Sequence, residues 1–276
     1  MRVSKIILGT WILVCGFLAS SAQAKEDYSE LWKKLGLEIK EPVKIKINLP
    51  AARLDFYIKD ELVKSYGVAI GSYKHQTPIR NFTMPYIYWN PWWYPPKDSE
   101  WAEKEEDTPP GPGNPLGLVK MKMQQGIMIH GTTSPWSIGR AASHGCFRMK
   151  NYQAKELAWE IQQRYSEKND PELLSVYQRN QKTTYYVPLL EAVPVEVSYH
   201  QVERFPDRLL LHPNLYWRKG FEQDLKDALA DQEDLLIDKV FIKKMDRLRL
   251  RHTVEVSLDE VHEWAGSTCR EESLGS

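Results

Sequence analysis

The sequence predicts a mainly β domain with few helices over residues 43–200, followed by a smaller α/β extension over residues 201–276. Residues 43–47 and 54–58 alternate apolar and polar side chains, which is the period of a strand with one buried face. Past residue 219, helical spacing and strand alternation follow one another. A chain of 276 residues is long enough for one large domain or two modest ones.

The first domain is expected to begin with an antiparallel meander of three strands, the third covering residues 62–70 and ending at Gly71. Five later segments show strand patterns: 82–89, 116–122, 127–130, 185–187 and 193–198. One helix is expected over residues 152–165, with Asn151 as its N-cap. Its buried face would be formed by Ala154, Leu157, Ala158 and Ile161, which recur at the helical period.

The extension is expected to contain a helix and two strands. Phe221, Leu225, Ala228 and Leu229 have helical spacing. Residues 247–251 and 253–258 alternate as strands do. The role of the extension stays open.

Residues 90–115 differ from the rest of the first domain. They begin with an aromatic, Pro-rich stretch, continue through an acidic run at 98–107, and end in a segment rich in Pro and Gly. Long irregular segments inside a domain are often functional covers. Two interpretations stay open, a lid over a site and a disordered surface loop.

The N-terminus has the pattern of a secretory signal peptide over residues 1–24. Arg2 and Lys5 precede an apolar run of about 14 residues, shorter than the roughly 20 needed to span a bilayer. The small residues before Lys25 predict cleavage after Ala24. We therefore expect a periplasmic protein without a membrane span after cleavage, in which residues 25–42 lead into the domain. An uncleaved anchor and lipidation at Cys15 are the alternatives.

The charge and cysteine content exclude several classes of protein. Lys plus Arg and Asp plus Glu both number 37, and removal of the signal peptide leaves 35 basic residues. Nucleic-acid binding normally shows as a basic excess, so it is not expected. Three cysteines are too few for a disulfide-stapled small fold or a cysteine-rich zinc site.

The residues with the clearest chemistry lie between His130 and Arg148. A thiol acts as a nucleophile in its thiolate form, and a neighbouring imidazole can take the proton from Cys146. His144 would share a face with Cys146 in an extended segment, whereas His130 could reach it across a sheet. Gly145 lets the backbone turn so that consecutive N–H groups face one oxyanion. Arg140 and Arg148 are suited to holding a carboxylate.

Three other interpretations of these residues are open. Cys146 could pair with Cys269 in a disulfide, because exported proteins often pair their cysteines. His130, His144 and Cys146 could bind zinc, although no fourth ligand is apparent. The histidines could also be hydrogen-bonded structural residues.

The motif resembles the signature of the L,D-transpeptidase catalytic domain, also called the YkuD domain. The resemblance rests on His130-Gly131-Thr132, on twelve residues between His130 and Ser143, and on the block Ser143-His144-Gly145-Cys146-x-Arg148. It extends to Asn48-Leu49-Pro50 and Gly111-Pro112-x-Asn114-Pro115, and covers roughly residues 43–198. Phe147 departs from the smaller aliphatic residue usual at that position, and no wall-binding repeat precedes the domain.

The resemblance implies a β-sandwich-like fold and cysteine acyl transfer on peptidoglycan stem peptides, without a cofactor. Cys146 would be the nucleophile and His130 the general base, oriented by the carbonyl of Gly131. The N–H groups of His144, Gly145 and Cys146 would form the oxyanion hole, with Ser143 and His144 supporting the site. Arg148 would position the substrate.

The resemblance leaves the acyl acceptor open. A diamino-acid side chain would give a 3–3 cross-link, and a lysine would attach a lipoprotein. Water would make the protein a carboxypeptidase or a hydrolase that detaches protein from the wall. A non-catalytic wall-binding module, with Cys146 paired to Cys269, is the alternative from another class.

Overall fold

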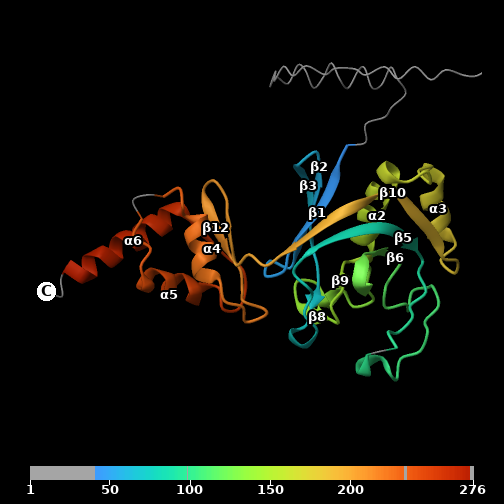
Figure 1. Cartoon of the computed structure of the whole chain (residues 1–276), viewed down its shortest axis with the longest axis horizontal. Helices are drawn as coiled ribbons and strands as arrows, with labels where there is room; N and C mark the ends of the chain where they lie inside the picture. Colours follow the sequence, from blue (N-terminus) through green and yellow to red (C-terminus); the bar gives the residue numbers. More distant parts are fainter. Residues whose placement is uncertain (1–40, 98, 233–234, 274–276) are drawn as a thin grey trace, which may run out of the picture. The chain divides into compact units, whose positions relative to one another are not determined.

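A computed structural model describes residues 41–97, 99–232 and 235–273, apart from the side chains of residues 101 and 266–273 (Figure 1). The expected signal peptide and nearly all of the lead-in lie outside these residues. In the described part of the chain, no helix is both long and apolar enough to cross a membrane.

The first domain is built on one mixed sheet of eight strands, in the order β3-β2-β1-β10-β5-β6-β7-β9 (Figure 1). The strands are β1 (Val43–Asn48), β2 (Arg53–Ile58), β3 (Glu61–Gly67), β5 (Asn81–Trp89), β6 (Val119–Lys122), β7 (Met128–His130), β9 (Phe147–Arg148) and β10 (Tyr185–Ser198). The predicted antiparallel meander of β1, β2 and β3 is confirmed. The mainly β prediction for this domain is therefore correct.

Two predicted strand boundaries were wrong. The strand predicted at 62–70 ends at Gly67, and β4 (Ile70–Gly71) instead pairs with β8 (Ala141–Ser143) in a separate small sheet. The segments 185–187 and 193–198 are one strand, β10, whose register shifts between Pro188 and Val193. Local alternation does not reveal such a shift, because the strand continues through it along β5.

The sheet curls so that its two edges come together. Ala69, just after β3, exchanges two backbone hydrogen bonds with Arg148 of β9, at 2.9 and 3.0 Å. Since β3 and β9 are the first and last strands in the order, this bridge joins opposite edges of the sheet. The curl brings the segment around Gly71 beside the histidine–cysteine motif.

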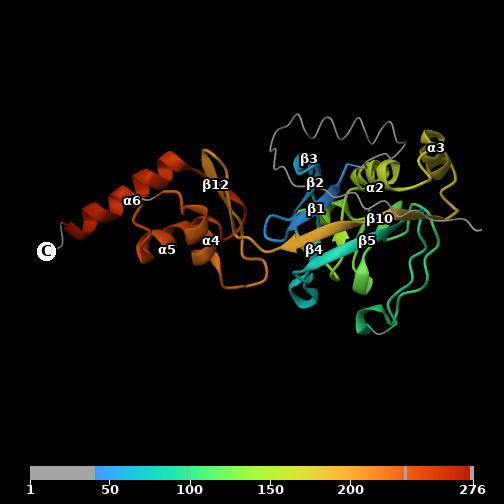
Figure 2. The same ribbon diagram turned by 45° about the horizontal axis from the view of Figure 1, so that its top comes forward.

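Helix α2 (Asn151–Tyr165) packs on the sheet against β6, β7 and β10 (Figure 2). It buries Ala154, Leu157, Ala158 and Ile161, as the spacing predicted. The predicted N-cap was wrong, because Lys150 occupies that position. The side chain of Asn151 instead accepts a hydrogen bond from Leu118 N and donates one to Thr132 O.

A second helix in this domain, α3 (Pro171–Arg179), was not predicted. Asp170 caps it by accepting a hydrogen bond from Glu172 N, and Pro171 occupies its first position. These are ordinary helix-start signals. Tyr177 is buried, and Leu173 and Leu174 pack against the core beside it.

The extension has an α/β fold, as predicted, with its own apolar core. Its three-stranded sheet has the order β11 (Val202–Arg204), β12 (Arg208–Leu211), β13 (Val254–Ser257). Its helices are α4 (Phe221–Ala228), α5 (Lys239–Leu248) and α6 (Leu258–Ser273). The helix predicted near 221–229 and the strand near 253–258 are confirmed.

The strand predicted at 247–251 was wrong, because α5 runs to Leu248 and the chain then turns. Asp238 caps this helix by accepting a hydrogen bond from Phe241 N, and Phe241 and Met245 face the core. The helical spacing of the apolar residues starts before residue 247 and extends into 247–251. It therefore outweighs the short alternating pattern in that segment.

Candidate active site

The imidazole of the motif lies on one strand, and the thiol lies in the turn just before the adjacent strand. His130 ends β7, and Cys146 directly precedes β9, the parallel neighbour of β7. His130 is in register with Arg148, and Cys146 lies two residues before Arg148. Arg148 and His130 share one face, and continuing the alternation of β9 by one residue beyond Phe147 puts Cys146 on that face as well. Ile129 and Phe147 are fully buried in the core on the other face.

His130 is held as a neutral base. Its ring is 5% exposed, and Nδ1 lies 2.6 Å from the carbonyl oxygen of Gly131. A carbonyl oxygen only accepts hydrogen bonds, so Nδ1 carries the proton and Nε2 keeps its lone pair. Burial lowers the pKa of His130 to about 4; the Gly131 carbonyl opposes this, and the charges of Arg148 and Lys120 add to it. Near neutral pH the ring is therefore neutral, and Nε2 carries no proton.

Cys146 carries a free thiol. Its Sγ lies 3.7 Å from the carbonyl oxygen of Gly126. Burial around the sulfur raises the pKa of Cys146 to about 11, against the opposing effects of the Met128 backbone and the Arg148 charge. The thiol is therefore neutral near pH 7, and it needs a base before it can attack a carbonyl group.

The turn between Ser143 and Cys146 is pinned by a buried hydroxyl. Ser143 Oγ accepts a hydrogen bond from Gly145 N at 3.1 Å and donates one to Cys146 O at 2.6 Å. Gly145 has a φ of +111°, which is strained for any residue with a side chain. The segment is therefore not extended, and the exposed ring of His144 contacts His75 with a centroid distance of 4.8 Å.

The loop after His130 is set by Asn151. A Cβ atom on Gly131 would lie 2.1 Å from Asn151 Oδ1, and one on Gly117 would lie 2.0 Å from it. Asn151 therefore fits only because both neighbours are glycines. Through its bond to Thr132 O it fixes the loop whose carbonyl orients His130. The sequence pattern predicted an N-cap role for this residue, whereas its side chain joins two loops.

A relay of hydrogen bonds links the extension to the motif. Tyr216 Oη donates to Gly71 O at 2.7 Å and accepts from Thr77 N at 3.2 Å. Thr77 Oγ1 in turn donates to Gly145 O at 2.9 Å. Tyr216 is 3% exposed and packs in the core of the first domain. In the sequence, Gly71 and Thr77-Pro78 belong to the family resemblance but carry no assigned role, and Tyr216 was missed because it lies far from the cysteine in the chain.

Of the two cations expected around the pair, only Arg148 has a charge that acts on it in the described part of the chain. Arg148 is half-buried, and its charge acts on both Cys146 and His130. Arg140 is exposed on the turn before β8. Lys120, which sequence reasoning missed, lies opposite His130 on β6, and its charge acts on the imidazole.

The base of the irregular segment is held in place by hydrogen bonds. Trp93 and Thr108 pair through two backbone hydrogen bonds of 2.9 Å, and buried Asn114 donates to the carbonyl groups of Pro91 and Thr108. Trp92 and Tyr94 are exposed and stack with a centroid distance of 6.0 Å. Lys120 Nζ donates to Trp92 O at 3.2 Å, which ties this segment to the strand beside His130.

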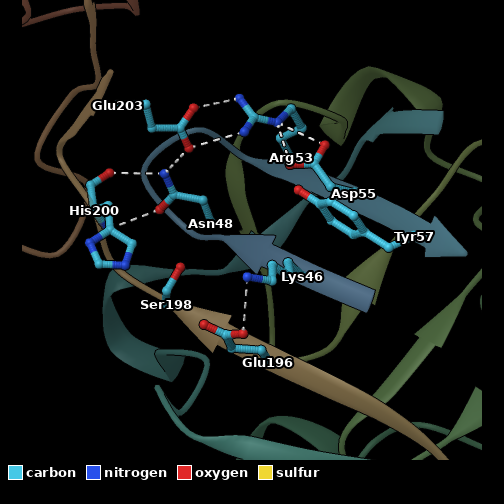
Figure 3. A pocket seen from close by; sticks show the side chains of 9 residues that line it. All are labelled: Lys46, Asn48, Arg53, Asp55, Tyr57, Glu196, Ser198, His200 and Glu203. Atoms are coloured by element: carbon cyan, nitrogen blue, oxygen red, sulfur yellow. Dashed lines mark hydrogen bonds and ion pairs between the residues drawn. The ribbon is translucent and has the colours of Figure 1, made fainter. Parts of the chain in front are cut away.

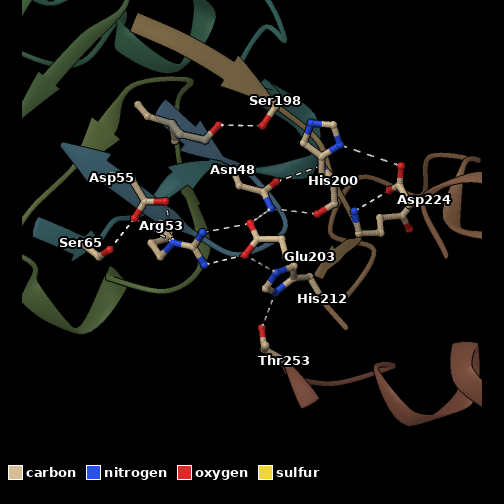
Figure 4. A network of polar contacts seen from close by, with 12 residues as sticks. Asn48, Arg53, Asp55, Ser65, Ser198, His200, Glu203, His212, Asp224 and Thr253 are labelled. Carbon is tan, nitrogen blue, oxygen red and sulfur yellow. Dashed lines mark hydrogen bonds and ion pairs between the residues drawn. The ribbon is translucent and has the colours of Figure 1, made fainter. Parts of the chain in front are cut away.

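A second polar cluster lies where the extension meets β1 and β2. It borders a cavity of about 160 Å³ lined by Lys46, Asn48, Arg53, Asp55, Tyr57, Glu196, Ser198, His200 and Glu203 (Figure 3). Arg53 binds Glu203 with both NH groups, at 2.8 and 3.0 Å, and Asp55 through Nε (Figure 4). Its charged groups bind one another, so this cluster joins parts of the chain rather than offering free ligands.

Zinc binding by the motif finds no support in the described part of the chain, where no group of three or more His, Cys, Asp or Glu residues could hold a metal ion. The alternative of a disulfide at Cys146 is not what the structure has, since this thiol is free. The side chain of Cys269 lies outside the described residues.

Comparison with known proteins places these residues in a family. The model of the YkuD L,D-transpeptidase catalytic domain matches residues 42–189, more than half of the chain. The chain belongs to this family. The L,D-transpeptidase match contains His130 and Cys146 and ends before Tyr216, so the relay from the extension lies partly outside it.

Curated relatives carry the same family description. A putative L,D-transpeptidase YkuD of Bacillus licheniformis is 34% identical over 118 residues, which is 42% of this chain and 59% of the relative. A probable L,D-transpeptidase ErfK/SrfK of Escherichia coli is 33% identical over 122 residues, or 41% of this chain and 39% of the relative. The chain thus spans well under two thirds of the relatives it matches.

A solved L,D-transpeptidase from Mycobacterium smegmatis aligns with 57% of this chain and 59% of its own, at 15% identity and a TM-score of 0.35.

Proposed function

We propose that this L,D-transpeptidase-family chain transfers acyl groups of peptidoglycan stem peptides through a thioester on Cys146. The observation that carries the proposal is the neutral, buried His130, with its proton on Nδ1 and its Nε2 available on the face shared with the thiol. An imidazole with a free lone pair can serve as the general base that a neutral thiol needs before it can attack.

In the first half-reaction, His130 Nε2 takes the thiol proton while Sγ of Cys146 attacks the carbonyl carbon of the third residue of a stem tetrapeptide. The bond to the terminal D-Ala breaks, the D-Ala nitrogen takes the proton from His130, and a thioester remains. We assign the oxyanion to the N–H groups of the turn 144–146. Of these, the Gly145 amide already donates to Ser143 Oγ, so it would share or exchange this bond when the oxyanion forms.

In the second half-reaction, an amine attacks the thioester and restores the thiol. A diamino-acid side chain would give a 3–3 cross-link, and a lysine would attach a lipoprotein. With water as acceptor, the same site would be a carboxypeptidase or a hydrolase. Arg148, and more remotely Arg140, would hold substrate carboxylates. We place this reaction in the periplasm, after removal of residues 1–24.

The test is incubation of the full chain with purified muropeptides, followed by mass analysis of products and of the protein. We expect a protein adduct and either a cross-linked dimer or a tripeptide. Cys146→Ala should abolish both, whereas Cys269→Ala, a matched loss of one thiol outside the motif, should leave them intact. Turnover by Cys146→Ala would overturn the proposal.

Thiol labelling of the folded protein separates this proposal from a wall-binding module. We expect one reactive thiol that disappears in Cys146→Ala. Absence of a labelled thiol before reduction would instead support a Cys146–Cys269 disulfide and a non-catalytic role.

A further inference from the structure

Five residues form a row across the large sheet. Tyr186, Tyr88, Lys120, His130 and Arg148 are successive register partners on β10, β5, β6, β7 and β9. Register partners point to the same face of a sheet. The next row, Val187, Ile87, Met121, Ile129 and Phe147, is fully buried in the core. The first row therefore lies on the opposite face, together with the thiol.

One half of this row is aromatic and the other half is cationic. Tyr88 and Tyr186 are in ring contact at 5.2 Å, and Tyr186 is 43% exposed. Lys120 Nζ lies 5.0 Å from the centre of the Tyr88 ring. Neighbouring strands are about 4.8 Å apart, so Lys120 and Arg148 flank His130 by one strand on each side.

The two cations of the row lack an acidic partner. Both are half-buried, and among the residues that the structure describes no Asp or Glu forms an ion pair with either of them. Within the described ranges, Lys120 Nζ donates to the Trp92 carbonyl and lies over the Tyr88 ring. Burial lowers the pKa of Lys120 to about 8, and Lys122 adds to this. A carboxylate that binds here would offset the desolvation of these cations and form charge-assisted hydrogen bonds with them.

We propose that Lys120 is a substrate-binding residue that receives a carboxylate of the peptide, on the side of His130 opposite to Arg148. The peptide would lie across the strands, with Tyr88 and Tyr186 as the floor beyond Lys120. This assignment rests on the proposed function. With Lys120 and Arg148 on opposite sides of His130, the site would bind most tightly a peptide that has carboxylates on both sides of the reacting carbonyl group.

The test measures binding of a synthetic stem tetrapeptide to the full chain carrying Cys146→Ala, by calorimetry. Adding Lys120→Met should weaken binding about tenfold, the size of one hydrogen bond to a charged group. Lys120→Arg should restore most of the affinity. Lys122→Met, which removes an exposed charge two residues along the same strand, should change it less than about twofold.

The same peptide with its carboxylates converted to carboxamides completes the test. It should bind with equal affinity to the chain that keeps Lys120 and to the chain that carries Lys120→Met. Unchanged binding of the acidic peptide after Lys120→Met, or equal losses for both peptides, would overturn the proposal. If the wild-type chain forms a thioester but Lys120→Met binds normally, this inference alone fails. If the wild-type chain forms no thioester and no variant binds the peptide, the proposed function fails with it.

Discussion

The chain contains two polar clusters that differ in how their charges are used. At the junction with the extension, Arg53 is bound by two carboxylates, and Glu203 is bound by Arg53 and by Asn48 (Figure 4). Around His130, two half-buried cations have no acidic partner among the described residues. We call the first cluster saturated, because its charges are paired within the chain, and such pairs stabilise contacts between segments. We call the second cluster unsaturated, because its cations can still bind an acidic ligand. Composition, with equal numbers of acidic and basic residues, conceals this difference.

The largest effect is expected from removing the base of the unsaturated cluster. His130→Gln should lower the rate of Cys146 acylation by about 100-fold to 10,000-fold, because the imidazole is the group placed to take the thiol proton. Mass spectrometry of the protein over time measures this rate. The matched control is His200→Gln at the junction, whose ring is exposed and remote from the thiol. Equal losses of acylation rate in both variants would show that His130 has no special role in activating the thiol.

Breaking the saturated cluster should affect stability. Glu203→Gln leaves Arg53 without its bidentate partner and should lower the free energy of unfolding by about 2 kcal/mol. Urea denaturation measures this change. Glu196→Gln, which removes the partner of Lys46 from an exposed pair at 3.5 Å, should cost less than about 0.5 kcal/mol. Similar costs would show that the junction is not a stabilising cluster.

The link between the two regions is tested at Tyr216. Tyr216→Phe removes the hydroxyl that bonds Gly71 O and Thr77 N, and should slow acylation of Cys146 about tenfold by loosening the turn. Tyr199→Phe is the control, since its hydroxyl bonds Tyr216 N and Asn214 but not this loop. Both should lose stability. Equal acylation rates in the two variants would show that the hydrogen bonds of Tyr216 do not influence the reactivity of Cys146.

The two clusters should also lose stability in different ranges of acid pH. Burial lowers the pKa of His130 to about 4, so the folded state binds fewer protons than the unfolded state as pH falls from 6.5 to 4, and stability declines there. Burial would raise the pKa of Glu203, but bonds from His212 and Arg53 outweigh it and lower the pKa to about 2. The decline due to Glu203 therefore falls between pH 4.5 and 2.

Urea unfolding at several pH values checks this separation. His130→Gln should flatten the first decline and Glu203→Gln the second. A single decline that both variants remove would show that the clusters are coupled.

The smallest effect is expected from the irregular segment. Replacing residues 99–107 by a short Gly–Ser turn keeps the Trp93–Thr108 pair and should raise hydrolysis relative to cross-linking severalfold, because water reaches the thioester more easily. The product ratio by mass checks this. An unchanged ratio would mean that this segment does not cover the site.

Most of the fold and the core of the site could be predicted from the sequence. The meander, the buried face of α2 and the α/β character of the extension follow from local periodicity. The pair His130 and Cys146 could be predicted because a short motif contains both. The N-cap assigned to Asn151 failed because its side chain serves a loop 19 residues earlier, which no local pattern encodes.

The sequence by itself determined which side chains could carry the proposed chemistry, because thiol, imidazole and glycine have intrinsic properties. Only the tertiary structure decided their protonation, since burial and the Gly131 carbonyl make His130 a neutral base. It also decided which distant residues join the site. The pairing of β6 with β7 places Lys120 opposite His130, and the packing of the extension places Tyr216 in the core of the first domain. Both depend on contacts between segments far apart in the chain, and these form only when the sheet curls and its edges meet.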